Sequence, residues 1–540
     1  MMFHRTRYLG SALALAAAAA ALPALAARPL IDAVAAGVPV IAGVRDLGPI
    51  AASSAISVAM TLAYRHADQL ERLIDHQSDP SSPLYRHFLS NAQFNGYFAP
   101  SRADYARVAA ALRRAGFTVS HVYTNRTLLD ATAPAGIAER YFKTVIHTVA
   151  QPGHGLRYAN AAPALLPAEL VGTVDSVVGL DNLEKARFTY QFGPRRARFG
   201  PDNVGGPLHG PDGGFGPLAL ATGFDFPVQH GFGGKGEAVA NVAGDVADSD
   251  LAAFEAYFGI ARTGALLRTQ IQGPSQGANI EATLDVETMA SLDPNADVHL
   301  YILQNPVDQP GEDAYNQIVT DNSVVAVNSS FGVCENSDPS YGVAAKKIVA
   351  QGEVKGISWA ASTGDGGAAQ CGGPQLLPAA LARVTGLGGT SLSVDQNGNY
   401  VSESAWNGGG GGISSTFKLP RFQQGVAGLG STTNRNLPDV AFPADPATGY
   451  SFYYQGAWQG PIGGTSWSSP TFVALQAEVD QMEKSRQGYA NPKIYRIFKA
   501  SQYKAFHDIT TGNNGFPAKA GYDNATGIGS IVGFAFGRRE

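Results

Sequence analysis

Two patterns of apolar positions alternate along residues 218–540. Short continuous apolar runs indicate strands buried on both faces, and longer runs with apolar residues at helical spacing indicate helices. The strand-like runs are EAVANVAG, DVHLYIL, SVVAVNSS, KGISWAAST and RVTGLGG, and the helix-like runs are DLAAFEAYFG, ANIEATLDVETMASL, SYGVAAKKIVAQGE and SSPTFVALQAEVDQMEKS. Their alternation predicts an α/β domain whose mostly parallel sheet is flanked by helices.

Residues 28–191 follow a different pattern. Leu70 and Ile74 recur at helical spacing before SDPSSP ends the helix. A second helix is expected in SRADYARVAAALRRAGFTV, with Ser101 as its N-cap and Gly116 as its stop. Strand-like runs such as TVIHTVA follow. This mixture predicts a separate, small α+β domain.

Glycine and proline dominate residues 192–217, which read FGPRRARFGPDNVGGPLHGPDGGFGP. A segment of this composition buries little apolar surface, so we expect an exposed linker that proteases can reach. It carries a basic cluster at Arg195, Arg196 and Arg198. The linker is either a passive connector or the processing region of a zymogen.

The first 27 residues have the features of a secretory signal peptide. Arg5 and Arg7 precede an alanine-rich apolar run, and Ala24-Leu25-Ala26 offers a small-residue cleavage site. A membrane anchor is the weaker interpretation, because the run ends at Pro23. No later run is long and apolar enough to span a bilayer. We therefore expect a protein exported to the periplasm or the medium, with no membrane contact once the signal is removed.

Composition narrows the classes of function. The chain has 540 residues, 15% of them charged, and a formal net charge of −5. This balance provides no basic stripe for nucleic acid. Cys334 and Cys371 either form one disulfide or are two free buried thiols, and their spacing indicates neither a zinc site nor a catalytic thiol.

Candidate chemistry begins at GGTSWSSP, where Ser466 follows two glycines and a threonine. A nucleophilic serine needs a base to take its proton and a group to stabilise the oxyanion. The C-terminal part holds three histidines, His230, His299 and His507, and none lies in a signature typical of a catalytic histidine. A histidine-dependent serine hydrolase is therefore disfavoured.

Carboxylates offer a better base. Glu281 and Asp285 lie four residues apart in a predicted helix, so their side chains stack on one face, whereas Glu287 points about 120° away from Glu281. A buried pair of this kind titrates as a unit, with one apparent pKa raised. It can accept a serine proton at acidic pH, where a histidine is already protonated. The competing interpretation is an exposed acidic helix face.

The third candidate is Asp365, which follows an apolar strand in the glycine-rich turn TGDGG. Loops after the carboxyl ends of parallel strands are where sites form in open α/β sheets. A protonated Asp365 could donate a hydrogen bond to an oxyanion. The alternative is an ordinary turn aspartate.

Taken together, ExxxD at residues 281–285, GD in a glycine-rich turn and GTSxxxP at residues 464–470 resemble the sedolisins, a family of serine-carboxyl peptidases. The stretches VTGLGGTSL, GGGGGIS and LPDVAFPADPATGY occur in the family's order, and SPLYRHFLSNAQFNGYFAPSRADYARVAAALRRAGF resembles its pro-kumamolisin-type activation domain. The resemblance implies a signal peptide (1–27), a propeptide domain (28–191), a linker (192–217) and a subtilisin-like peptidase domain (218–540).

The resemblance also implies a role for each candidate. Ser466 would be the nucleophile, Glu281 its general base, Asp285 a hydrogen-bond partner of Glu281, and Asp365 the acid of the oxyanion hole. A protonated Asp365 implies activity in acid that falls towards neutral pH. The substrates would be proteins or peptides, with an endopeptidase favoured over a tripeptidyl-peptidase. The enzyme would be a monomer inhibited by its own propeptide, which acid would release by protonating carboxylates of the interface.

The C-terminal stretch HDITTGNNGFPAKAGYDNATGIGS resembles the family's calcium site. Asp508 and Asp523 would supply carboxylates, and Ile509, Lys519 and Gly521 would supply backbone carbonyls for one structural Ca²⁺ ion. An all-oxygen shell is what calcium prefers. Lys519 departs from the glycine usual there, and its charge could weaken binding. A non-enzyme alternative is also open: an exported, calcium-stabilised binding protein on the same scaffold.

Overall fold

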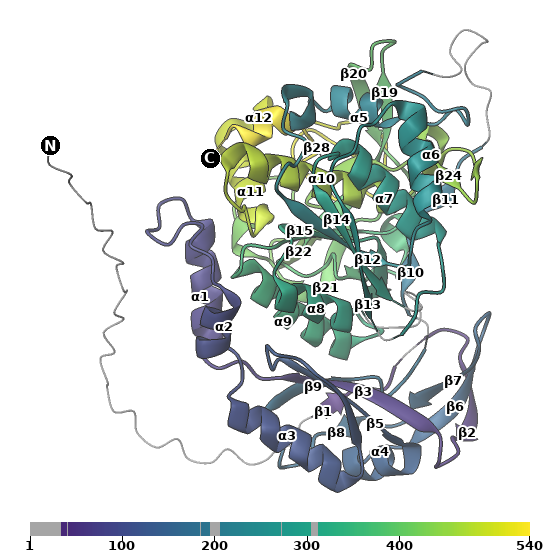
Figure 1. Cartoon of the computed structure of the whole chain (residues 1–540), viewed down its shortest axis with the longest axis vertical. Coiled ribbons are helices and arrows are strands. Elements are labelled where there is room, and N and C mark those ends of the chain that lie inside the picture. The colour runs from purple at the N-terminus through teal and green to yellow at the C-terminus, as the bar shows by residue number, and fades with distance from the viewer. Residues whose placement is uncertain are drawn as a thin grey trace, which may run out of the picture.

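The structure is a computed structural model that describes residues 34–39, 41–183, 185–194, 206–271, 273–303 and 311–539. The predicted signal peptide and the arginine cluster at residues 195–198 lie outside these ranges. The described chain folds into two units, with the N-terminal unit below the larger C-terminal one in Figure 1. Within the described residues, no helix is both long and apolar enough to cross a membrane.

The larger unit is built on an eight-stranded sheet with the strand order β13-β14-β12-β15-β17-β19-β20, and β23 also pairs with β19. Every pairing is parallel except that of β20, which runs antiparallel to β19. The strands are β12 (Ala238–Ala243), β13 (Leu266–Ile271), β14 (Asp297–Leu303), β15 (Ala326–Ser329), β17 (Ser358–Ser362), β19 (Thr385–Val394), β20 (Tyr400–Ala405) and β23 (Val440–Pro443). The predicted α/β fold is therefore confirmed.

Helices cover both faces of this sheet. One face carries α7 and α10 in the larger core cluster, and the other carries α8 and α9 in a second cluster. The principal helices are α5 (Pro217–Gly223), α6 (Asp248–Phe258), α7 (Ile280–Leu292), α8 (Glu312–Asp321), α9 (Pro339–Glu353), α10 (Thr465–Glu483), α11 (Ala490–Ser501) and α12 (Gly533–Gly537). Because β12 comes first in the chain and lies between β14 and β15, the strand order reverses beside it. Ligand sites form at such switch points, beyond the carboxyl ends of the strands.

The N-terminal unit is α+β, as predicted. Its main sheet is antiparallel, in the order β4-β5-β3-β9, and a second sheet has the order β2-β6-β7. The elements are β2 (Arg45–Pro49), β3 (Ala55–Leu62), α1 (Ala67–Ser78), α2 (Asn91–Tyr97), α3 (Arg102–Ala115), β4 (Thr118–Val122), β5 (Leu128–Pro134), α4 (Ala135–Phe142), β6 (Ile146–Gln151), β7 (Gly155–Asn160) and β9 (Val174–Val178). Ser101 caps α3, and Gly116 ends it at φ 100°.

The two units are joined through α9. Leu70 and Ile74 of α1 and Phe94 of α2 share an apolar cluster with Ala350 of α9. In Figure 1, α1 and α2 accordingly extend from the N-terminal unit along the side of the larger one. This contact holds the smaller unit against the helical layer that α9 forms on one face of the sheet.

After β9 the chain leaves the N-terminal unit and crosses the larger one as two short strands. In antiparallel pairing, β10 (Arg187–Phe188) joins β16 (Phe331–Cys334), and β11 (Gln191–Phe192) joins β26 (Ile462–Gly463). Figure 1 shows β10 and β11 following one another along the side of the larger unit. Residues 187–192 therefore lie in this unit as an extended strand.

The described half of the predicted linker is more buried than expected. Phe215 is only 8% exposed and belongs to the main core cluster. Gly214 allows this close packing, because a Cβ on it would lie 2.5 Å from the backbone nitrogen of Ser451. Residues 210–217 thus pack in part against the larger unit, although Gly206, Pro207 and Pro211 are exposed.

Candidate active site

Ser466 lies in the first turn of α10, two residues after Gly464, and is fully buried. Gly464 has φ 116°, which favours glycine. A Cβ there would lie 2.1 Å from the carbonyl oxygen of Thr189 and 2.5 Å from Oδ2 of Asp365. The glycine before the serine therefore keeps open the space in which the serine, the aspartate and a peptide carbonyl meet.

Pro470, the last residue of the GGTSWSSP stretch, changes the hydrogen bonding at the start of α10. A proline has no N–H, so Pro470 leaves the carbonyl of Ser466, four residues earlier, without its helical donor. The hydroxyl oxygen of Ser330 lies 3.3 Å from that carbonyl, and Ser466 Oγ lies 3.2 Å from the carbonyl oxygen of Ser330. The start of α10 is thus attached to the loop after β15, where the candidate acids converge.

Glu281 is the second residue of α7, whose N-cap is Asn279. Its side chain is buried, and neither carboxylate oxygen has a hydrogen-bond partner of normal geometry among the described residues. Burial and the nearby charges of Asp285 and Asp365 raise its pKa, whereas the hydroxyls of Ser466 and Ser330 lower it. Glu281 is therefore a buried base that faces the candidate nucleophile.

Asp285 lies one turn further along α7 and is also buried. Its Oδ1 accepts a 2.6 Å hydrogen bond from Ser330, whose oxygen accepts one from Asn328 at 2.9 Å. Asn328 in turn donates to Asn241 on the neighbouring strand, at 2.9 Å. Burial raises the pKa of Asp285 to about 8. A proton shared with Glu281 would supply the donor that the unpartnered oxygens lack.

Asp365 follows β17 and faces the start of α10. Its Oδ1 accepts hydrogen bonds from the amide (2.8 Å) and the hydroxyl (3.0 Å) of Thr465, while its Oδ2 is buried without a partner. Burial raises its pKa to about 7. Because both Thr465 groups are directed at Oδ1, a proton on Asp365 belongs on Oδ2, the atom nearest the open space at Gly464.

The peptide carbonyl in that space belongs to the chain itself. The amide of Ser466 donates to the Thr189 carbonyl at 2.9 Å. The Thr189 hydroxyl lies 2.8 Å from Ser466 Oγ and donates to Ser362 Oγ at 2.7 Å. The pKa of the next residue, Tyr190, is raised by burial and by the charge of Glu281. The Thr189–Tyr190 peptide thus lies between the candidate nucleophile, base and acid.

The three histidines are engaged elsewhere. His230 pairs with Asp225 at 2.7 Å, and His299, on β14, hydrogen-bonds Thr269 at 2.9 Å. The ring of His507 stacks on Tyr400 with centroids 3.6 Å apart, and burial lowers its pKa to about 4. The hydrogen bonds of Ser466 itself go to Thr189 and Ser330. None of these three histidines is a partner of Ser466, so the candidate base remains the carboxyl of Glu281.

The two carboxylates predicted to bind calcium, those of Asp508 and Asp523, both accept hydrogen bonds from the segment 519–521 of the C-terminal loop. Asp508 accepts from the Gly521 amide at 3.3 Å, and Asp523 accepts from the Lys519 amide at 2.9 Å. Burial raises the pKa of both, and neither forms an ion pair with a lysine or arginine in the described chain. Asp523 also accepts hydrogen bonds from the amides of Ala525 and Thr526, and carboxylate oxygens of this kind are ligands that calcium prefers. In the part of the chain that the structure describes, no group of three or more His, Cys, Asp or Glu side chains is arranged to hold a metal ion.

Sequence reasoning missed the polar residues that hold the acids in place: Asn241, Asn328, Ser330, Ser362 and Thr465. Ser330 and Asn328 lie at the end of SVVAVNSS, a run that predicted only a strand. Two adjacent small polar residues at the end of a predicted strand, beside a switch in strand order, are the signal that could have found them. Cys334 and Cys371, for which the sequence allowed either a disulfide or two free thiols, form a disulfide.

Comparisons with known proteins follow the same division of the chain. A family profile described as "Pro-kumamolisin, activation domain" matches residues 42–183. Sedolisin from Pseudomonas sp. (strain 101) is 30% identical over 89% of this chain and 86% of its own length. Tripeptidyl-peptidase 1 of Bos taurus is 25% identical over 90% of this chain and 91% of its own length. Relatives of both names therefore align with the two units together.

One solved structure is similar to the larger unit. It is described as Pseudomonas sedolisin (serine-carboxyl proteinase) complexed with two molecules of pseudo-iodotyrostatin. It covers 60% of this chain and 97% of its own, with 26% sequence identity and a TM-score of 0.53. The architecture around Ser466 is thus that of a known peptidase.

Proposed function

The chain belongs to the sedolisin family of serine-carboxyl peptidases with an activation domain, and from this premise we propose that it is a secreted, acid-active endopeptidase made as a self-processing zymogen. The single observation that carries the proposal is the Thr189–Tyr190 peptide, which lies at Ser466 with its carbonyl on the serine amide. A continuous peptide strand through the cleft is how a substrate would lie.

In the proposed reaction Ser466 Oγ attacks the carbonyl carbon of the substrate, and its proton passes to Glu281. The oxyanion accepts hydrogen bonds from the Ser466 amide and from protonated Asp365. The C–N bond then breaks as Glu281 gives its proton to the leaving amine. Water attacks the acyl-enzyme, with Glu281 again taking and returning a proton.

Acid dependence follows from the three buried carboxyls. Each negative charge raises the pKa of the others, so they do not all ionise together. The productive state carries one negative charge, on Glu281, with Asp365 protonated. Since burial raises the pKa of Asp365 to about 7, this state is lost as the pH rises through that value. It is also lost in strong acid, when Glu281 becomes protonated. We therefore propose a bell-shaped pH profile on the acid side of neutrality.

The course of the chain favours endopeptidase over tripeptidyl-peptidase action. Counting back from the Thr189–Tyr190 bond, Arg187 is the third residue and Ala186 the fourth. Ala186 is 6% exposed and packs in the second core cluster with Phe331 and Val333. The cleft therefore accommodates substrate beyond the third residue, where a tripeptidyl-peptidase would need a barrier.

Self-processing is proposed at the Thr189–Tyr190 bond, just before the linker in which the sequence predicted it. Until this cut, residues 187–192 fill the cleft and make the propeptide an intramolecular inhibitor.

We further propose that the signal peptide directs export and that the mature enzyme is a monomer. We also propose that one Ca²⁺ ion is held by Asp508 and Asp523 with the loop carbonyls of Ile509, Lys519 and Gly521.

Hydrolysis of a denatured protein by purified full-length chain, after incubation in acid and as a function of pH, tests this function. The wild type should cleave in acid and release a fragment that begins at Tyr190. Ser466→Ala and Glu281→Gln should lose both substrate hydrolysis and self-cleavage. Neutral-pH activity that survives Glu281→Gln would refute the carboxylate base. Absence of activity under all conditions would favour a binding protein.

A further inference from the structure

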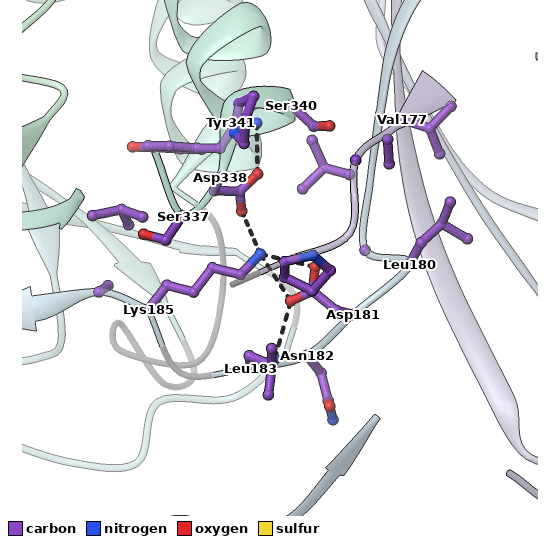
Figure 2. Close-up of a pocket in the computed structure, with 18 of the residues that line it drawn as sticks. Val177, Leu180, Asp181, Asn182, Leu183, Lys185, Ser337, Asp338, Ser340 and Tyr341 are labelled. Atoms are coloured by element: carbon purple, nitrogen blue, oxygen red, sulfur yellow. Dashed lines mark hydrogen bonds and ion pairs between the residues drawn. The ribbon is translucent and has the colours of Figure 1, made fainter. Parts of the chain in front are cut away.

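A cavity of about 90 Å³ lies where the propeptide strand enters the cleft. Figure 2 shows Lys185 crossing it, with its ammonium between the carboxylates of Asp181 and Asp338. Lys185 Nζ lies 2.8 Å from Asp181 and 2.7 Å from Asp338. The side chains of Lys185 and Asp338 are only 9% and 11% exposed. A lysine is therefore bound in a largely enclosed site.

The two carboxylates belong to different parts of the chain. Asp181 and Lys185 both precede the Thr189–Tyr190 bond and would leave with the propeptide. Asp338 belongs to the larger unit, where it caps α9 by accepting a 3.0 Å hydrogen bond from the Tyr341 amide at Oδ1. Its other oxygen, Oδ2, is the one that binds Lys185. Once the propeptide leaves, Asp338 Oδ2 loses its cation.

The register fixes where this carboxylate stands relative to a substrate. Arg187 pairs with Gly332 and Phe188 with Phe331. Continuing this antiparallel pairing outward brings Ala186 beside Val333 and Lys185 to the end of β16, from which the chain runs on to Asp338. Lys185 is the fifth residue before the Thr189–Tyr190 bond. A substrate strand that replaced residues 185–192 would bring its own fifth residue to Asp338.

We propose that Asp338 is a specificity-determining residue, which makes the enzyme prefer peptides with lysine or arginine five residues before the cleaved bond. This inference rests on the proposed peptidase function and deepens it. The propeptide's Lys185 occupies the subsite as the first substrate residue would. When the propeptide leaves, Asp338 Oδ2 is free to pair with another cation, and a basic side chain from the substrate can take the place of Lys185.

Three eight-residue peptides test the preference. One has the sequence of residues 185–192, KARFTYQF, and the others carry alanine or glutamate in place of the lysine. The enzyme is the full-length chain after self-processing, assayed in acid at a single pH for all three peptides. Cleavage between threonine and tyrosine is followed by mass spectrometry. We expect kcat/KM to be about tenfold higher for the lysine than the alanine peptide, and lowest for glutamate.

The variant Asp338→Asn removes the charge and keeps an N-cap residue for α9. The ratio of kcat/KM between lysine and alanine peptides should fall to about one in this variant. In the control Asp248→Asn, an aspartate whose side chain is 75% exposed, the ratio should stay near tenfold. Equal cleavage of both peptides by the wild type, or a preference that persists in Asp338→Asn, would overturn the inference while leaving the peptidase standing. No cleavage of any peptide would overturn both.

Discussion

In the proposed mechanism, Asp365 determines the upper pH limit of the reaction. Thr465 directs two hydrogen-bond donors to one of its oxygens, so the other oxygen must carry the proton that an oxyanion needs. An asparagine placed there could accept from Thr465 through its oxygen and donate through its amide at every pH. Comparing Asp365→Asn with Asp365→Ala therefore separates two effects: the loss of the hydrogen-bond donor and the loss of the group that titrates.

We expect Asp365→Ala to lose about 100- to 1000-fold in kcat, because an oxyanion donor is removed. Asp365→Asn should retain more activity than the alanine variant, and its activity should no longer fall as the pH rises through about 7, the pKa of Asp365. Steady-state kinetics on a peptide substrate from about pH 3 to pH 8 measures both effects. A falling limb unchanged in Asp365→Asn would assign the titration to another group.

Sequence reasoning found residues whose signal is local and missed those whose role depends on pairing between strands. The four-residue spacing of Glu281 and Asp285 and the glycine before Ser466 are readable in one short window each. Asn241 and Ser330 lie 89 residues apart in number, and only the parallel pairing of β12 with β15 brings their strands together. Thr189 had no signal, because an occupant of a cleft looks like any extended residue.

At the scale of elements, the disulfide links the two sides of the site. Cys334 ends β16, which pairs with the propeptide strand, and Cys371 follows the turn that carries Asp365. The bond closes a loop with a sequence separation of 37 residues. Such a link reduces the freedom of the unfolded chain and keeps the Asp365 turn near β16.

Replacing both cysteines by serine should lower the free energy of unfolding by about 3–4 kcal/mol, the loop-entropy contribution for a loop of this length. Thermal unfolding of the variant and of the wild type, both carrying Ser466→Ala to prevent self-cleavage, measures the difference. A reductant should lower the wild-type Tm and leave that of the double serine variant unchanged. Equal Tm values without reductant would contradict a stabilising role.

Calcium should stabilise the loop between Asp508 and Asp523. At a free concentration of 100 times Kd, bound calcium adds about 2.7 kcal/mol to the free energy of unfolding. A chelator should therefore lower the Tm, and added Ca²⁺ should restore it. Asp508→Ala should be insensitive to both, whereas Asp395→Ala, in a turn outside this loop, should respond like the wild type. A wild-type Tm that ignores the chelator would argue against the site.

The sequence predicted individual helices and strands better than it predicted how segments pack against one another. The five strand-like and four helix-like runs of residues 218–540 each contain an element of that type, because continuous apolar runs and helical periodicity report burial directly. The linker at residues 206–217 was expected to be exposed because it is rich in glycine. Gly214 instead allows the backbone to approach Ser451, so here glycine marks close packing.

At the scale of the whole molecule, many carboxyl groups are buried with raised pKa values. Burial raises the pKa of Asp285 to about 8, and those of Asp313 and Glu403 to about 7. Burial likewise raises the pKa of Glu287 and Asp480. In each case the folded state binds protons more tightly than the unfolded chain. The stability that they contribute is therefore full in acid and is lost as the pH rises through 7 to 8.

We expect the Tm of the Ser466→Ala protein to fall between about pH 4 and pH 8, measured by scanning calorimetry. Glu403 accepts hydrogen bonds from Thr390 and Ser530, and glutamine can keep an acceptor there without a charge. Glu403→Gln should therefore show a smaller fall across the same range. A Tm that rises with pH would mean that ion pairs outweigh the buried acids.

Acid acts on the interface between the two units in opposite directions. Lys347 pairs with Asp175 and Arg383 with Glu71, and protonating these carboxylates would loosen the contact, as the sequence suggested. At Asp130 acid has the opposite effect and strengthens the contact, because burial and the charge of Asp313 raise the pKa of Asp130 to about 9. Docking of the N-terminal unit on the larger one at Asp130 therefore takes up a proton and is favoured in acid. The proposed release in acid would therefore need cleavage of the strand as well as loss of these ion pairs.

The strand of residues 187–192 also determines the kinetic order of activation. A peptide bond already lying at Ser466 has an effective concentration far above that of any free substrate. A cut there is a first-order event whose half-time is independent of how much protein is present. Dilution would leave it unchanged, and outside peptides would compete poorly. Afterwards the severed propeptide is an ordinary bimolecular inhibitor, whose hold weakens as it is diluted.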